Sequence, residues 1–386
     1  MGACAHAPHL SPVAGTQPAD YSFLCAQKFP NGQPAKKVSA PQELNVRSCD
    51  MSTWDFSSYT AQELADVLTF DSKTKFPAKD KLPKGFKPNA ILKKNKNPGL
   101  GLRKLHRQGI TGKGVNVAIL DQNLLIDHEQ YAERIRYYWQ DPIYQDIGKA
   151  SMHGPAVASI LAGKTVGVAP QANIYYWAND LKIDDHNILD DEAVAKDLMR
   201  IANYNGWMDE NNKIRVLSIS RGFGPHDKDY EKLKDAIRYL ENDANIAVFT
   251  TNDVFTLSRT HSLAAPDDTD YCRPAYWFTK EDLAFYDKIQ NPSVPSDFRV
   301  TAAPNGITDY AHYATGGLSW AVPYMAGLYA LGVQVYPDLT KEVFLDAVRQ
   351  TATPKTCTYQ GTPFTVAYFV NPSALITYLQ RLNSQH

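Results

Sequence analysis

The chain has 386 residues, of which 44% are hydrophobic and 21% charged, so it has the composition of an ordinary globular protein with a packed core. Its formal net charge of -1 gives no overall attraction to nucleic acid or to an anionic membrane. No apolar run reaches the roughly 18 residues that suggest a membrane span, and residues 1–27 lack the basic start and apolar segment of a secretory signal. We therefore expect neither a nucleic-acid partner nor a membrane span.

The cysteines form no C-x-x-C pair and no cluster with histidine at zinc-ligand spacing. They are Cys4, Cys25, Cys49, Cys272 and Cys357. An odd count in a long chain is more typical of free thiols than of a disulfide framework. We therefore expect reduced cysteines, with one pair among the first three as the alternative. The compartment stays open, with the cytoplasm slightly favoured over secretion.

Residues 1–95 differ in composition from the rest of the chain. Pro, Ser, Lys and Asn are frequent there, and the only helix that the pattern predicts lies around residues 60–68. Between Lys73 and Lys113, basic residues are dense and Asp80 is the single acid. Such a run is typical of a solvated linker, and an exposed strand open to proteolysis is the alternative. We predict an N-terminal extension over residues 1–95 and a second domain over residues 96–386.

From residue 109 onward, short apolar strands alternate with longer helices. Residues 115–120, apolar except for Asn116, form the run expected of a central parallel strand. Further strands are predicted at 174–177, 216–220 and 246–250, and helices at 156–162, 190–204, 230–240, 321–335 and 341–350. This alternation predicts an α/β fold with a mostly parallel central sheet. Residues 253–304 show no clear period.

Three residues with catalytic chemistry lie at matching places in this pattern. Asp121 ends the first buried strand, at the edge where open parallel sheets bind ligands. His153 opens a helical stretch, and Ser319 follows two glycines at the start of a long apolar helix. Taken singly, each is more often a turn former, a helix cap or a surface residue. Their order along the chain is nevertheless that of the subtilisin triad, a worked example of this chemistry.

In such a triad the three side chains have distinct roles. Asp121 would hold the imidazole tautomer, and His153 would remove the proton that keeps the Ser319 hydroxyl a poor nucleophile. The start of a helix also directs backbone N–H groups toward a developing oxyanion. A histidine base predicts activity that rises as the imidazole loses its proton.

Four segments resemble the subtilisin-like serine proteases, or subtilases, and the resemblance extends over roughly residues 109–382. They are Val117–Asp121 for the aspartate strand, His153–Ala158 followed by Gly167–Pro170 for the histidine helix, Val248–Asp253 for the oxyanion-hole strand and Gly317–Pro323 for the serine motif. The resemblance implies a three-layer α/β/α peptidase domain and a serine endopeptidase without cofactors. It also implies that Asn252 and the backbone N–H of Ser319 stabilise the oxyanion.

The resemblance further implies that an extended peptide or protein substrate pairs with backbone along the cleft. Ser220 and Gly222 match the family's substrate-binding strand. Arg221 replaces a small apolar residue there, and we expect it to favour acidic substrate side chains, a solvated rim arginine being the alternative. The loop at residues 163–166 is short, so we expect no calcium there and no other metal. We expect a monomer.

Several residues beside the motifs depart from the family pattern. Gln122 and Asn123 follow the aspartate, Thr251 precedes Asn252, and Leu318 precedes the serine. These departures motivate the alternative of a catalytically impaired subtilase fold that acts as a binding or regulatory scaffold. An α/β-hydrolase esterase fits poorly, because its nucleophile lies in G-x-S-x-G and its triad runs serine, acid, histidine. The N-terminal extension resembles a propeptide in position only, and an accessory region is the alternative.

Overall fold

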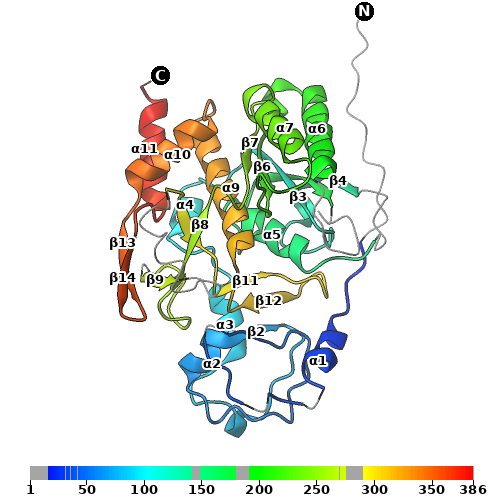
Figure 1. The fold of residues 1–386 in the computed structure, drawn as a ribbon, viewed down its shortest axis with the longest axis vertical. Coiled ribbons are helices and arrows are strands. Elements are labelled where there is room, and N and C mark those ends of the chain that lie inside the picture. The colour runs from blue at the N-terminus through cyan, green and yellow to red at the C-terminus, as the bar shows by residue number, and fades with distance from the viewer. Residues whose placement is uncertain are drawn as a thin grey trace, which may run out of the picture.

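A five-stranded parallel sheet forms the centre of the computed structural model, which describes residues 16–385 except 31, 35, 41, 141–147, 180–190, 269 and 275–289 (Figure 1). The strand order is β4-β5-β3-β6-β7. In that order the strands are Ile135–Gln140, Asn173–Ala178, Asn116–Asp121, Ile214–Ile219 and Ala247–Phe249. Strand β3 is buried along its whole length, which explains the apolar run from Val117 to Leu120.

Helices cover both faces of this sheet (Figure 1). On one face lie α5 and α9, and on the other α6 and α7; their bounds are His153–Ala162, Leu318–Val335, Asp191–Trp207 and Tyr230–Asn242. Alternate residues of β3 point into the two cores: Val117 packs with α5 and α9, and Leu120 with α6 and α7. The predicted three-layer α/β/α fold is thus confirmed.

The strands and helices predicted after residue 109 are confirmed to within a few residues. The irregular stretch after residue 253 holds further strands, which the sequence did not predict. They are β8 (Phe255–Arg259), β9 (Tyr271–Pro274), β10 (Ser293–Pro295), β11 (Arg299–Ala302) and, just beyond, β12 (Tyr310–Tyr313). After α10 (Lys341–Thr351), the chain adds a hairpin of β13 (Lys355–Tyr359) and β14 (Thr362–Val366) and a last helix, α11 (Pro372–Asn383), which packs on α9.

The N-terminal region, residues 16–95, is more ordered than its sequence predicts. Besides the expected helix, its described residues form two further α-helices, a short 3-10 helix at Lys79–Lys81 and two short strands. The elements are α1 (Ser22–Lys28), β1 (Leu44–Asn45), α2 (Ala61–Val67), β2 (Leu68–Asp71) and α3 (Pro88–Asn95). The apolar side chains of this region, including Trp54 between the elements and Phe70 in β2, form a core of their own. Strand β2 also joins a second sheet, in the order β1-β2-β12-β11.

The prediction of a solvated linker between Lys73 and Lys113 is wrong. This stretch contains α3 and a further helix, α4 (Leu102–Arg107), and Ile91 and Leu102 are buried. The lysines and arginines cover the outside of these helices, and a few apolar positions between them anchor the helices to the rest of the protein.

The expectation of free cysteines is also wrong. Cys25 pairs with Cys49, whose Cα atoms are 5.3 Å apart, and Cys272 pairs with Cys357 at 5.0 Å. The count of cysteines carries no information on which of them the fold brings together. Cys4 lies outside the described residues. Two disulfides weigh against the slight preference for the reducing cytoplasm. Within the described part of the chain, no helix has both the length and the apolarity needed to cross a bilayer.

Candidate active site

Asp121 and His153, which are 32 positions apart, meet at the carboxyl end of the parallel sheet. The carboxylate ends β3 and its side chain is only 2% exposed, while the imidazole belongs to the first residue of α5 and is 21% exposed. His153 Nδ1 lies 2.6 Å from Asp121 Oδ1, and the backbone N–H of Gln122 donates to the same oxygen at 2.8 Å. A proton on Nδ1 completes this hydrogen bond and leaves Nε2 as the basic nitrogen.

Ser319 lies in the first turn of α9, where backbone N–H groups have no acceptor within the helix. The turn begins at Gly317, whose φ of 65° and ψ of -175° suit glycine alone. The half-buried hydroxyl donates to the carbonyl oxygen of Ser220 at 3.4 Å, and Ser220 Oγ donates to the carbonyl oxygen of Ser319 at 2.9 Å. The end of β6 therefore contacts the segment that carries the predicted nucleophile.

Trp320 connects the histidine to this segment. Its ring centroid lies 5.3 Å from that of His153, at an interplanar angle of 50°. Because Trp320 directly follows Ser319, the structure brings the predicted acid, base and nucleophile segments to one place on the molecule. This tryptophan was not singled out from the sequence.

Asn252 follows β7 and has an exposed side chain that is fixed by the neighbouring backbone. Its Nδ2 donates to the carbonyl oxygen of Phe223 at 2.6 Å, and its Oδ1 accepts from the N–H of Phe223 at 3.2 Å. An amide nitrogen carries a second N–H for a further acceptor. A Cβ on Gly222 would lie 2.9 Å from Asn252 Oδ1, so the predicted substrate-binding glycine provides the room that this asparagine needs.

The placement of Arg221 argues against the predicted role in substrate selection. The residue is 8% exposed, and its Nη2 lies 2.6 Å from Oδ1 of the fully buried Asp191 at the start of α6. A guanidinium engaged in a buried ion pair is fixed by its partner, so this contact favours a structural role for Arg221. The acid that it meets is 30 positions away in the sequence, so the motif alone gave no sign of the pair.

A buried carboxylate that the sequence did not reveal supports the loop before Ser319. Asp297 Oδ1 accepts from the N–H of Gly316 at 2.7 Å, and its carboxylate also accepts from the hydroxyls of Ser258 and Ser296. Burial raises the pKa of the Asp297 carboxyl, and these three hydrogen bonds oppose the rise. Its hydrogen bond to Gly316 ties the loop to the core three residues before the serine.

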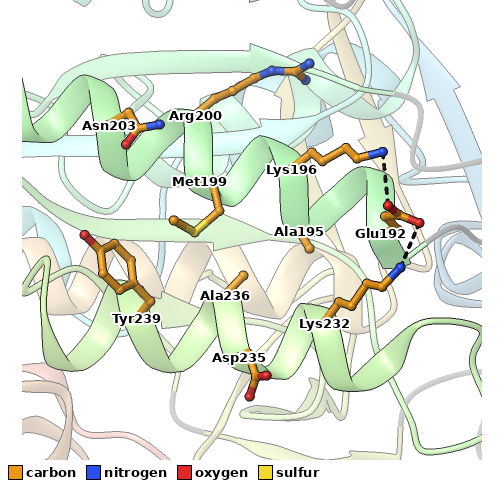
Figure 2. Close-up of a pocket in the computed structure, with 10 residues that line it drawn as sticks. All are labelled: Glu192, Ala195, Lys196, Met199, Arg200, Asn203, Lys232, Asp235, Ala236 and Tyr239. Carbon is orange, nitrogen blue, oxygen red and sulfur yellow. Dashed lines mark hydrogen bonds and ion pairs between the residues drawn. The ribbon is translucent and has the colours of Figure 1, made fainter.

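A shallow groove of about 560 Å³ lies away from these residues, between α6 and α7 (Figure 2). Its floor includes Ala195 and Ala236, and Lys196 and Lys232 both reach Glu192 across its rim. None of the predicted site residues lines this groove. Among the described residues, no group of three or more His, Cys, Asp or Glu side chains is placed to hold a metal ion.

A family model and a curated protein that match this chain both concern subtilisin-like proteases. Residues 112–285 match the model of the Subtilase family. The curated subtilisin-like protease PopC of Myxococcus xanthus is 24% identical over 273 residues, covering 62% of this chain and 56% of PopC, so the chain spans little more than half of that relative.

Two solved structures share the fold. The prenylagaramide maturation protease PagA has a TM-score of 0.50 at 20% identity, covering 72% of this chain and 98% of PagA. The PatG macrocyclase domain has a TM-score of 0.51 at 15% identity, covering 72% of this chain and 95% of that domain. At such identities the likeness concerns the fold alone.

Proposed function

We propose that this chain, a divergent member of the subtilase family, is a serine endopeptidase in which Ser319 is the nucleophile, His153 the base and Asp121 its partner. The observation that carries the proposal is the 2.6 Å contact between His153 Nδ1 and Asp121 Oδ1. It lies at the end of a buried parallel strand, beside the helix start that holds Ser319.

The proposed reaction has two halves. His153 Nε2 takes the proton of Ser319 as its Oγ attacks the peptide carbonyl carbon, and the imidazolium then protonates the leaving amine. Water, deprotonated by the same nitrogen, then attacks the acyl carbon. The bond to Ser319 Oγ breaks, the imidazolium returns the proton to this oxygen, and the carboxylic acid leaves. In both halves, the negative oxygen would accept hydrogen bonds from the second N–H of Asn252 and from the Ser319 backbone.

The surroundings of Asp121 support this proposal despite the altered sequence after it. The N–H of Gln122 donates to Asp121 Oδ1 at 2.8 Å, so the backbone supplies a hydrogen bond to the carboxylate whatever the Gln122 side chain does. The substrate would be an extended peptide that pairs with the end of β6, where Ser220 and Gly222 lie. In this proposal residues 96–386 are the peptidase domain.

A catalytically impaired scaffold is the alternative. It is favoured by the hydrogen bond that already engages Asn252 Nδ2 with Phe223, and by Thr251 and Leu318 beside the proposed catalytic residues. Both hypotheses predict the same fold, so only chemistry at Ser319 separates them.

Hydrolysis of an unfolded protein substrate tests the proposal. We expect the wild type to cleave it, Ser319→Ala to lose cleavage while keeping its circular dichroism, and Ser384→Ala, which alters an exposed serine at the end of α11, to cleave like the wild type. Cleavage that persists in Ser319→Ala would contradict the assignment of the nucleophile. A folded wild type that cleaves nothing would favour the scaffold.

A further inference from the structure

The N-terminal region is joined by backbone to the segment that leads to Ser319. Strand β2 pairs antiparallel with β12, whose residues 310–313 directly precede the serine loop. One residue beyond the strand, the N–H of Ala314 donates to Thr69 Oγ1 at 2.9 Å. A strand and a side chain from the start of the chain thus hold the segment that ends five residues before Ser319.

A row of side chains continues from this junction to His153. Arg47 Nη1 donates to the hydroxyl of Tyr313 at 2.8 Å, and its guanidinium lies 5.1 Å from the centre of the same ring. The Tyr313 ring meets Trp320 edge-on at 5.2 Å, and Trp320 meets His153 at 5.3 Å. Tyr313 and Trp320 are 4% and 3% exposed, so close packing transmits a displacement of one ring to the next.

A second contact reaches the loop before the histidine. The main chain of Gln17 bridges to Lys149 in parallel fashion, and the N–H of Ala150 donates to the Gln17 carbonyl oxygen at 3.0 Å. Nearby, Thr16 Oγ1 accepts from the N–H of Ile126 at 2.9 Å. The N-terminal region therefore contacts the segment that leads to His153 as well as the segment that leads to Ser319.

The contact between the N-terminal region and the rest of the chain is formed by buried side chains, as in the interior of a domain. Asn305 Nδ2 donates to the buried Asp71 at 2.8 Å, and the buried rings of Phe70 and His312 are 5.3 Å apart. Removal of β2 would leave the edge of β12 that faces away from β11 unpaired and Asn305 without Asp71, at a cost of roughly 1–3 kcal/mol for each unsatisfied group.

We propose that the N-terminal region is a permanent part of the active site, in which Arg47 and Tyr313 are positioning residues that hold Trp320 against His153. This inference rests on the proposed peptidase function. Proteolytic removal of the N-terminal region would also remove Arg47 and Thr69, and Trp320 would lose the contacts that support it through Tyr313.

The kinetics of Arg47 variants test the inference. Active sites are titrated with a fluorophosphonate, and kcat is expressed per titrated site. In Arg47→Ala, we expect kcat per site to fall roughly tenfold to a hundredfold with little change in KM, because a small misplacement of a catalytic group has effects of this size. Arg47→Lys should recover part of the loss, since it keeps a charged donor near the Tyr313 hydroxyl. Lys75→Ala, which removes an exposed ion pair with Asp50, is the matched control, and its kcat per site and KM should equal those of the wild type.

A purely structural role has a different signature. If Arg47→Ala lowers the number of titrated sites and leaves kcat per site unchanged, the positioning role is overturned. The intact mass of the titrated wild type gives the second readout: the labelled species should retain residues 44–71, and an active species without them would overturn the inference. A folded wild type that neither hydrolyses peptides nor reacts with the probe would overturn the proposed function together with this inference.

Discussion

The carbonyl oxygen of Asn123 lies only 2.7 Å from the position that a Cβ on Gly154 would occupy, closer than real Cβ atoms approach. The hydroxyl of Tyr176 lies equally close to that position. The residue after His153 must therefore be glycine, because it packs directly against the loop that follows Asp121.

Gly154→Ala should consequently separate the acid from the base. We expect kcat/KM to fall at least tenfold and the free energy of unfolding to fall by about 1–3 kcal/mol, as for other overpacked sites. Gly206→Ala in α6, where no atom lies within 4 Å of the added carbon, is the matched control and should keep wild-type activity. Equal kinetics for the two variants would show that Gly154 does not set the position of His153.

Asp121→Asn tests the role of the carboxylate. The amide keeps the shape of the side chain but holds the imidazole in the wrong tautomer, and the corresponding change in a Ser-His-Asp triad lowers kcat about 10⁴-fold. We expect a loss of this order at neutral pH, measured by hydrolysis of a peptide substrate, with unchanged thermal stability as the check on folding. A loss below tenfold would contradict the proposed pairing.

The predictable part of the site is the part that lies on periodic elements. Asp121 and His153 were predicted because a buried strand and an apolar helix leave clear hydrophobic patterns around them. The contacts that link Arg47, Tyr313 and Trp320 were not predicted, because Arg47 and Tyr313 are 266 positions apart and no local sequence pattern indicates such a contact.

The same limit applies to other remote contacts. The resemblance that aligned Arg221 with a substrate-binding strand carries no sign of its ion pair with Asp191, 30 positions away. The Cys25–Cys49 disulfide falls within the alternative of one pair among the first three cysteines, but Cys272–Cys357, which joins residues 85 positions apart, was not predicted. In the N-terminal region, core residues such as Trp54 and Phe56 lie outside the helices and strands, where no helical or strand periodicity marks them as buried.

Asn252→Ala tests the proposed oxyanion donor. Loss of one such donor typically lowers kcat about 10²–10³-fold, and we expect an effect of this size on kcat with a smaller one on KM. Because Asn252 also holds the backbone of Phe223, thermal stability must be followed in parallel. If kcat is unaffected, the asparagine serves only to hold Phe223.

His312, in β12, makes the stability of the folded protein dependent on pH. Burial, with smaller effects of Arg259 and Lys94, lowers the pKa of His312 from 6.5 to about 3. As the pH falls below 6.5, the unfolded chain takes up a proton that the folded state refuses, so stability is lost between about pH 6.5 and pH 3. The slope is about 1.4 kcal/mol per pH unit.

Urea denaturation at several pH values measures this effect. His312→Gln should flatten the pH dependence by up to that slope, whatever its effect on absolute stability. Identical slopes for the variant and the wild type would mean that His312 titrates normally in the folded protein.

The identity of the residue that a fluorophosphonate modifies tests the central claim most directly. Peptide mapping of the labelled protein should place the adduct on Ser319 alone, and His153→Ala should slow the labelling by several orders of magnitude, because the hydroxyl then lacks its base. An adduct on another residue, or a labelling rate that does not depend on His153, would contradict the account.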